Sequence, residues 1–228
     1  MFFDKPHFRI MGDRALLVEW GDEINPLINQ AVRELFFSLD NQKIQGVAEL
    51  VPGYCSLLIQ YDPLRLPLST LQEIITLSSR KSQAVYIADS RTHKIPVIYG
   101  GSYGPDLQWV ADYHDLSIPE VIRLHTGTVY RGYMIGFTPG FPYLGELPDA
   151  IAAPRKEKPR TLVPRGSVAI AQKQTGIYPS DSPGGWQILG WTAVKLFNPF
   201  ANPPGLIGMG DQVTFVSVTE EEMKQWVL

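Results

Sequence analysis

Cysteine is almost absent from this sequence, since Cys55 is the only one among 228 residues. A single thiol cannot close an intramolecular disulfide, and it cannot supply the paired thiolates of a common structural zinc site. The first ten residues include Asp4 and Lys5 and contain no apolar core of signal-peptide length. We therefore expect a cytoplasmic protein in a reducing compartment, and we predict no metal site.

A long uninterrupted hydrophobic run is also missing. The longest uncharged stretch, residues 196–210, is broken by Pro199, Pro203, Pro204 and Gly205. It falls short of the ~20 apolar residues that a membrane helix needs. The net charge of −3 and the isoelectric point of about 5.8 are lower than those of most nucleic-acid binders. We predict neither a membrane nor a nucleic acid as a partner.

The common nucleotide-binding motifs are absent. The sequence has no Gly-Lys dipeptide, which excludes a Walker A loop, and no G-x-G-x-x-G pattern that would hold a pyrophosphate. It also has no H-E-x-x-H motif and no Ala-Met-Lys-Met setting for biotin attachment. A phosphate group, if the protein handles one, must be bound by other residues.

Glycine and proline are scarce only in the first part of the chain. Residues 1–92 contain 4 glycines and 5 prolines, whereas residues 93–228 contain 16 and 14. This contrast predicts a regular α/β domain followed by a loop-rich β domain. We place the boundary between residues 92 and 93, in a polar stretch between two apolar segments.

The first domain, residues 1–92, is predicted to contain four strands and two helices. Its strands are expected at residues 8–10, 15–20, 47–50 and 54–61. Asn25 before Pro26 is a helix-start signal, and Ser69 with Gln72 has the spacing of a capping box for a second helix. Helices that alternate with strands in this way indicate a ferredoxin-like α/β sandwich.

The second domain, residues 93–228, is predicted to begin with a strand at 94–99 and helices at 106–114 and 117–126. Strands separated by Pro/Gly turns are expected at residues 128–135, 167–171, 187–189, 193–197 and 213–218, before a terminal helix at 220–227. This pattern is typical of a barrel or a sandwich, so the fold class is α+β.

His125 lies on the apolar stripe of the predicted helix at 117–126, in line with Ile118, Val121 and Ile122. One interpretation is a buried, hydrogen-bonded core histidine. The other is a residue that transfers a proton or contacts an anion, since the C-terminal end of a helix favours the protonated ring.

Residues 154–173 carry six basic side chains and one acidic side chain, and prolines interrupt the run at positions 154, 159 and 164. Such a run is either a solvated face or an anion site held rigid by its prolines. Two loops rich in aromatic residues, 136–145 and 182–187, accompany it. Their glycines and prolines argue against a regular helix or a central strand, and they either plug a barrel end or line a small-molecule or protein-binding site.

Several ordered motifs in the second domain resemble one known family. They are Gly104-Pro105-Asp106-Leu107, residues 136–145, Pro154-Arg155, Pro159-Arg160, Val163-Pro164, and residues 166–171, 174–179 and 182–186. The chain resembles the family of 5-oxoprolinase B subunits, which includes the sporulation-kinase inhibitor KipI and proteins labelled allophanate hydrolase subunit 1. The resemblance implies a small N-terminal α/β domain and a C-terminal cyclophilin-like β-barrel.

The resemblance also implies partners and an activity. Family members are similar to one half of the carboxyltransferase module of biotin-dependent urea carboxylase. The 5-oxoprolinase members act with a second barrel protein of the C type and a third protein of the A type to open 5-oxo-L-proline to L-glutamate, with ATP as co-substrate. The alternatives are a KipI-like protein that binds and inhibits a sensor histidine kinase, and a carboxyltransferase-like member of urea metabolism.

The family resemblance further implies which residues line the cleft: His125 and Arg160 in catalytic roles, with Phe137, Phe141, Tyr143, Arg155, Trp186 and Gln187 binding the substrate. The arginines would neutralise a phosphate or carboxylate, His125 would move a proton, and the aromatic rings would exclude water. One departure stands out, because this chain has Trp191 where the family typically has an arginine between glycine and threonine.

Overall fold

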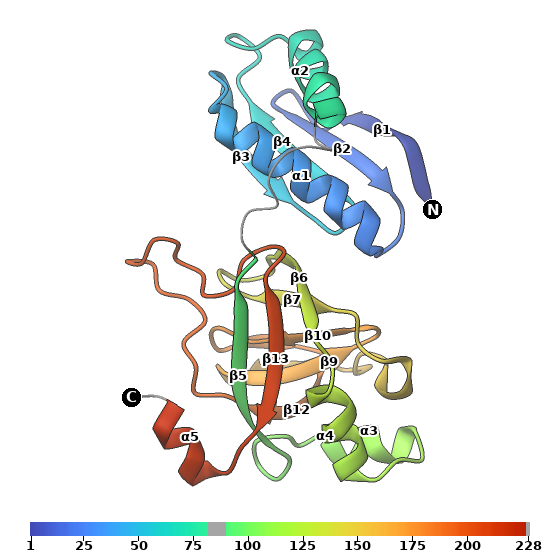
Figure 1. The fold of residues 1–228 in the computed structure, drawn as a ribbon, viewed down its shortest axis with the longest axis vertical. Coiled ribbons are helices and arrows are strands. Elements are labelled where there is room, and N and C mark those ends of the chain that lie inside the picture. The colour runs from blue at the N-terminus through green and yellow to red at the C-terminus, as the bar shows by residue number, and fades with distance from the viewer. Residues whose placement is uncertain (82–89, 227–228) are drawn as a thin grey trace. The chain divides into compact units, whose positions relative to one another are not determined.

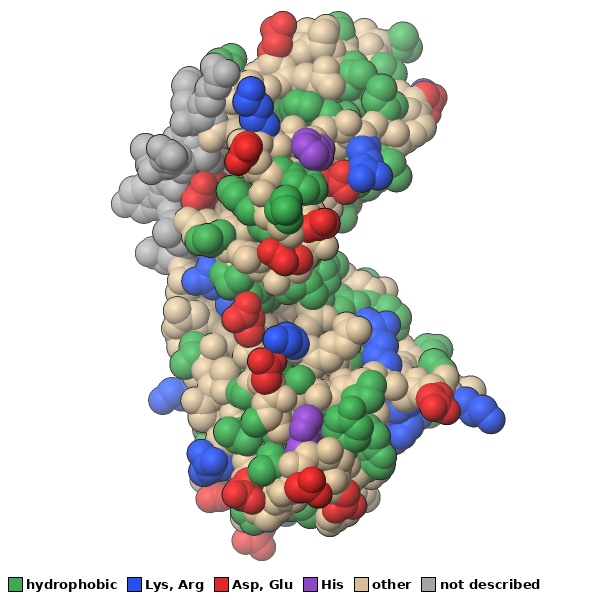
Figure 2. Space-filling model, turned by 90° about the vertical axis from the view of Figure 1, so that its right-hand side faces the viewer, with side chains coloured by type: hydrophobic (Ala, Val, Ile, Leu, Met, Phe, Trp, Pro, Cys, Tyr) green, Lys and Arg blue, Asp and Glu red, His purple; other side chains and the backbone are tan. Residues whose placement is uncertain are grey.

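The computed structural model describes residues 1–81 and 90–226 of the chain. The chain divides into two compact units, Met1–Asp89 and Ser90–Leu228 (Figure 1). No helix in the described ranges is both long enough and apolar enough to cross a membrane. Acidic and basic side chains both occur across the face shown in Figure 2, as expected for a nearly balanced net charge.

The N-terminal unit is an antiparallel four-stranded sheet with the strand order β1-β2-β4-β3. Its strands are β1 (Phe2–Ile10), β2 (Ala15–Gly21), β3 (Val47–Pro52) and β4 (Ser56–Tyr61), and its helices are α1 (Pro26–Gln42) and α2 (Leu68–Lys81). Helix α1 packs on β2, β3 and β4 and contacts α2. Apolar residues at alternate positions of β2 and β4 are buried with the apolar stripe of α1.

The sequence predicts the start of α1 correctly but not the start of α2. Asn25 caps α1 as expected, because its side-chain oxygen accepts a hydrogen bond from the Leu27 amide at 2.9 Å. Helix α2 begins at Leu68, so Ser69 lies inside the helix. The predicted capping box of Ser69 and Gln72 is therefore wrong.

The C-terminal unit is a closed barrel of seven strands in the order β10-β7-β6-β13-β5-β12-β9. These strands are β5 (Thr92–Tyr99), β6 (Tyr130–Ile135), β7 (Pro142–Gly145), β9 (Ser167–Ala171), β10 (Gln174–Ile177), β12 (Gln187–Trp191) and β13 (Gln212–Ser217). Strands β5 and β13 run parallel side by side (Figure 1), and the other barrel pairs are antiparallel. The α+β fold class and the C-terminal barrel are confirmed.

Smaller elements decorate the barrel. Strands β8 (Arg160–Val163) and β11 (Ser182–Gly184) form a separate two-stranded sheet. The helices are α3 (Leu107–Tyr113), α4 (Ile118–Thr126), the short 3-10 helix η2 (Asp149–Ile151) and α5 (Glu220–Trp226). Helix α4 starts with the predicted capping box, in which the Glu120 carboxylate accepts from the Ser117 amide at 2.9 Å. Val227, at the predicted end of the last helix, lies outside the described residues.

Two sequence predictions in this unit are wrong. Pro142–Gly145 was expected in an irregular loop but forms β7 inside the barrel. Pro142 opens the strand, where a missing amide is tolerated, and a side chain in place of Gly145 would meet the Tyr133 ring. Residues 193–197, expected as a strand, form only one isolated bridge, from Phe197 to Gly205.

The barrel unit contains two apolar clusters. The larger cluster joins the barrel interior to α3 and α4 and includes Val121, Tyr130 and Phe215. The smaller cluster contains Phe141, Val163, Ala169, Ala171, Tyr178, Trp186 and Ile188, with Tyr143 packed against it. The smaller cluster borders the basic segment, which places aromatic and cationic side chains together.

Candidate functional site

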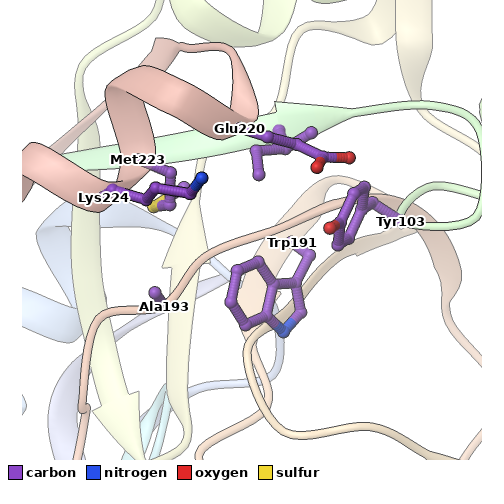
Figure 3. Close-up of a pocket in the computed structure, with 7 residues that line it drawn as sticks. Tyr103, Trp191, Ala193, Glu220, Met223 and Lys224 are labelled. Atoms are coloured by element: carbon purple, nitrogen blue, oxygen red, sulfur yellow. The ribbon is translucent and has the colours of Figure 1, made fainter. Parts of the chain in front are cut away.

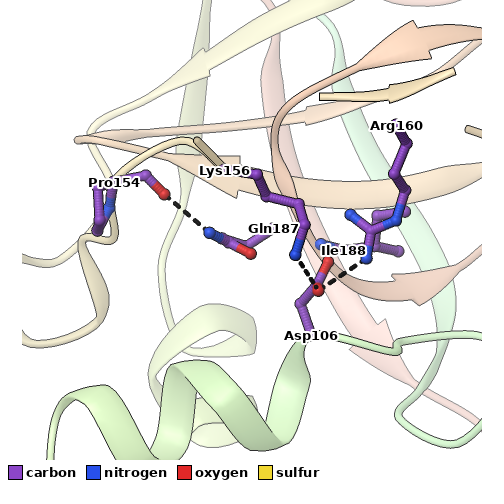
Figure 4. A network of polar contacts seen from close by, with 6 residues as sticks. All are labelled: Asp106, Pro154, Lys156, Arg160, Gln187 and Ile188. Atoms are coloured by element: carbon purple, nitrogen blue, oxygen red, sulfur yellow. Dashed lines mark hydrogen bonds and ion pairs between the residues drawn. The ribbon is translucent and has the colours of Figure 1, made fainter. Parts of the chain in front are cut away.

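A buried carboxylate, Asp106 at the start of α3, is the centre of a polar network (Figure 4). Its side chain is only 6% exposed. One oxygen, Oδ1, accepts from Lys156 Nζ at 3.1 Å and from Arg160 Nη2 at 2.8 Å. The other, Oδ2, accepts from the Ile188 amide at 2.7 Å. Asp106 therefore fixes the basic segment to α3 and to β12.

Burial and hydrogen bonding have opposite effects on the pKa of Asp106. Burial alone would raise the pKa of Asp106, but the hydrogen bonds from Arg160, the Ile188 amide and Lys156 outweigh it and lower the pKa. Asp106 is therefore ionised at neutral pH, and the three side chains together carry one excess positive charge. Arg160 Nη1 is buried without a partner among the described residues, so this guanidinium retains an unused donor.

Gln187, the first residue of β12, holds the beginning of the basic segment. Its Nε2 atom donates to the Pro154 carbonyl at 3.0 Å (Figure 4). Its Oε1 atom is buried without a partner among the described residues. The Lys156 amide donates to the Gly185 carbonyl at 2.7 Å. Backbone and side-chain bonds thus fix the basic segment at several points.

The aromatic side chains form a cluster around Phe141. Its ring centroid lies 4.8 Å from that of Tyr143, 5.1 Å from Tyr178 and 5.5 Å from Trp186. Phe137 meets Phe141 edge-on at 5.6 Å and is 60% exposed. These separations are those of attractive aromatic pairs. Four of the aromatic residues implied by the family resemblance therefore belong to one cluster of rings, each in contact with Phe141 or being Phe141 itself.

Phe137 has a backbone φ of +65°. This left-handed conformation is unfavourable for a bulky residue and costs about 1–3 kcal/mol. Strain of this kind is retained where a side chain has a function that another placement would not serve. An exposed aromatic ring on a strained turn is therefore a candidate contact for substrate or partner.

The cationic and aromatic groups are neighbours. Gly184 of β11 pairs with Arg160 of β8, and a side chain at Gly184 would meet the Tyr178 hydroxyl. Burial raises the pKa of Tyr143, and the positive charge of the exposed Arg155 opposes this shift. The structure therefore brings together Arg155, Arg160 and Gln187 with the aromatic cluster.

His125 lies elsewhere, in the larger apolar cluster. It is fully buried, and its ring is stacked on Phe215 at 4.5 Å. Its Nδ1 atom lies 2.6 Å from the Tyr99 hydroxyl, and its Nε2 atom lies 2.9 Å from Thr175 Oγ1. Burial lowers the pKa of His125 to about 3. This placement favours the core interpretation of His125 over the proton-transfer interpretation.

The hydrogen bonds around His125 determine its tautomer. Thr175 Oγ1 donates to the Ala169 carbonyl at 3.2 Å, so it must accept from the histidine. Nε2 therefore carries the proton, and Nδ1 accepts from the Tyr99 hydroxyl. The neutral ring satisfies all these partners, and protonation of Nδ1 would require the Tyr99 hydroxyl to accept from the ring instead of donating to it.

Sequence reasoning missed three members of the site: Asp106, Lys156 and Tyr178. Asp106 was part of a recognised motif and Lys156 of the basic run, but no sequence signal pairs two positions separated by 50 residues.

Gly100–Gly104 also matches G-x-S-x-G, a pattern that sequence reasoning overlooked. Its serine, Ser102, is exposed, and within the described ranges no hydrogen bond joins it to a histidine.

Among residues 1–81 and 90–226, no group of three His, Cys, Asp or Glu side chains is arranged as metal ligands. The buried polar atoms without a partner in these ranges include the Arg160 Nη1 donor and the Gln187 Oε1 acceptor. The site is therefore suited to an anion or to a polar organic molecule beside aromatic rings.

Comparison with known proteins gives consistent matches. The family model for the carboxyltransferase domain, subdomain C and D, matches residues 6–207. The B subunit of the Bacillus subtilis 5-oxoprolinase is 40% identical over 222 residues, covering 93% of this chain and 92% of that protein. The B subunit of the Haemophilus influenzae 5-oxoprolinase is 39% identical over 198 residues, covering 84% of this chain and 89% of that protein.

Solved structures share the fold. The crystal structure of TTHA0988 has a TM-score of 0.80 and 36% identity over 90% of this chain, which spans only 40% of the TTHA0988 chain. The uncharacterised protein PH0987 from Pyrococcus horikoshii is 42% identical, with a TM-score of 0.57, over 95% of this chain and all of that one. By its sequence and its fold, this chain belongs to the family of the carboxyltransferase domain, subdomain C and D.

Proposed function

We propose that this chain is the B subunit of a heteromeric, ATP-dependent 5-oxoprolinase that opens 5-oxo-L-proline to L-glutamate. The observation that carries the proposal is the 40% identity to the B subunit of the Bacillus subtilis 5-oxoprolinase over nearly the whole length of both chains. Proteins of the C type and the A type are its partners in this proposal. The chain is then expected to be inactive alone.

The chemistry requires activation of an amide. A lactam resists attack by water, and transfer of the terminal phosphoryl group of ATP to the amide oxygen releases ADP and makes nitrogen a better leaving group. Water then adds to the activated carbon, and the C–N bond breaks as nitrogen takes up a proton. Hydrolysis of the remaining acyl phosphate gives glutamate and phosphate. Groups that neutralise negative charge and exclude bulk water favour these steps.

The residues of this chain fit those needs. Arg155 is exposed beside the aromatic cluster, where its guanidinium is free to pair with the substrate carboxylate or a phosphate. Arg160 is held by Asp106 and directs its remaining donor from a fixed position. Phe137 supplies an exposed apolar surface with Phe141 and Trp186 buried behind it, and Gln187 has a buried amide oxygen without a partner among the described residues.

The test is glutamate release from 5-oxo-L-proline and ATP by the complex of this chain with its A-type and C-type partners. Arg155→Gln should raise KM, because it removes an anion contact. Lys158→Gln is the matched control, since Lys158 is an exposed cation in the same basic segment. Equal kinetics for the wild type and Arg155→Gln would remove Arg155 from the site.

A regulatory role in which the barrel binds a sensor histidine kinase is the second candidate, favoured by Trp191 in place of the usual arginine. A stable complex with the partner proteins but no glutamate release, together with inhibition of kinase autophosphorylation, would support that role. A role in urea metabolism is a third candidate, because the urea amidolyase of Saccharomyces cerevisiae is 26% identical over 95% of this chain, which spans 13% of that protein.

A further inference from the structure

A hollow lies between α5 and the barrel, and it shares no residue with the Asp106 network (Figure 3). Its volume is about 390 Å³, within the range of roughly 300–1,000 Å³ that is common for small-molecule sites. Ile98, Ala193 and Met223 supply its apolar surface. The similarity to 5-oxoprolinase B subunits assigns nothing to this hollow.

Two aromatic rings form one wall of the hollow. The ring centroids of Tyr103 and Trp191 lie 5.6 Å apart, with their planes tilted by 32°. Trp191 Nε1 donates to the Arg165 carbonyl at 2.8 Å, which holds the indole in place. A preformed aromatic wall favours a planar ligand, because stacking on a fixed ring loses little conformational entropy.

Two charged side chains of α5 face the rings from the opposite side. Glu220 and Lys224 lie one helical turn apart, and both point toward the hollow in Figure 3. The negative charge of Glu220, together with a hydrogen bond to its carboxylate, raises the pKa of the Tyr103 hydroxyl. A carboxylate accepts hydrogen bonds from an amino group, and an ammonium pairs with a phosphate.

These features describe one class of ligand. A purely apolar molecule would make no use of the exposed charges of Glu220 and Lys224, and a simple anion would make no use of the two rings. An adenine nucleotide satisfies every feature, since it has a planar ring, an exocyclic amino group and phosphates. We propose that the hollow between α5 and Trp191 binds an adenine nucleotide, with the base stacked on Trp191 and Tyr103. Glu220 accepts from the amino group, and Lys224 pairs with a phosphate.

The test is calorimetric titration of the full chain with adenosine, inosine and ATP. Adenosine should bind saturably, and inosine more weakly, because inosine has a carbonyl in place of the amino group. ATP should bind more tightly than adenosine by several-fold, and Lys224→Gln should abolish that difference. No saturable binding of adenosine, or equal affinities for adenosine and inosine, would overturn the proposal.

Substitutions of residues that line the hollow test whether adenosine binds there. Trp191→Leu should weaken adenosine binding by roughly tenfold or more, since it removes the stacking surface. Glu220→Gln should reduce the preference for adenosine over inosine, whereas Glu221→Gln, on the same helix but outside the hollow, should change nothing. If Trp191→Leu does not fold, Tyr103→Leu tests the same wall. Unchanged adenosine affinity in Trp191→Leu would contradict the assignment.

The choice of an adenine nucleotide rests on the proposed function, in which ATP is the co-substrate. The proposed function and the nucleotide site can be refuted independently, because nucleotide binding is measured without turnover and without partner proteins. Adenosine binding with no glutamate release in the assembled complex would remove the lactam substrate and leave the nucleotide site. Glutamate release without adenosine binding to this chain would assign the nucleotide to one of the partner proteins.

Discussion

Burial of a neutral His125 should make the barrel unit less stable in mild acid, because the ring is protonated only when the chain unfolds. The pKa of His125 is lowered by burial to about 3, whereas the ordinary value in an unfolded chain is 6.5. Between these values the unfolded chain binds a proton that the folded chain does not. Stability is therefore complete above pH 6.5 and falls as the pH drops below it.

The magnitude follows from the two pKa values. Each pH unit between them costs about 1.4 kcal/mol, so at about pH 5 the loss from this single group is about 2 kcal/mol relative to pH 7.5. His125→Gln removes the titration. The variant should be less stable than the wild type at pH 7.5, because it disturbs a packed core, but should lose about 2 kcal/mol less on acidification.

Urea unfolding followed by tryptophan fluorescence measures this difference. Trp20→Phe in the background leaves tryptophans only in the Ser90–Leu228 unit, so the signal reports on the barrel. His7→Gln is the matched control, because His7 is exposed, and it should leave the pH dependence unchanged. If His125→Gln does not fold, titration of the His125 ring in the wild type by NMR gives the pKa directly. A His125 pKa near 6.5, or equal slopes for His125→Gln and the wild type, would refute the reasoning.

Three further predictions concern the site and its supports. Asp106→Asn should destabilise the barrel unit by about 2 kcal/mol at neutral pH, because Arg160 and Lys156 lose their charged partner, and urea unfolding measures it. Since the pKa of Asp106 is lowered from 3.8, its contribution is complete above about pH 4 and is lost only below, so this variant should not alter the slope between pH 5 and 7. Phe137→Gly should leave the unfolding free energy unchanged to within about 1 kcal/mol, because relief of the strained φ offsets the lost ring contacts, while KM in the complex rises. Gly104→Ala should unfold at markedly lower urea than the wild type, because the added methyl would meet the Leu189 carbonyl; equal midpoints would show that the loop yields easily.

Local signals predicted much of the fold. Asn25-Pro26 and the Ser117–Glu120 pair mark true helix starts, because these capping contacts join residues only two or three positions apart. The glycine and proline of residues 142–145 predicted a loop, but packing within the barrel makes this segment a strand. In β7, Gly145 pairs with Arg131 of β6, and glycine is needed there because the Tyr133 ring occupies the space that a side chain would need.

The candidate site was predicted only in part, for a similar reason. Motif resemblance indicated Arg160, Trp186 and Gln187. The structure places Trp186 against Phe141, Gln187 against the Pro154 carbonyl and Arg160 against Asp106. Asp106, which anchors Arg160, could not be inferred, because its importance depends on burial and on a contact across 54 residues. His125 shows the limit of periodicity, since an apolar stripe predicts burial but cannot indicate which polar atoms will satisfy the ring.

The most direct test of the proposed function is ATP-dependent glutamate release from 5-oxo-L-proline as this chain is added to a mixture of its A-type and C-type partners. The partners alone should be inactive, and activity should rise with added chain until a fixed stoichiometry is reached. Full activity without this chain, or none after a stable three-component complex has formed, would contradict its assignment to a 5-oxoprolinase.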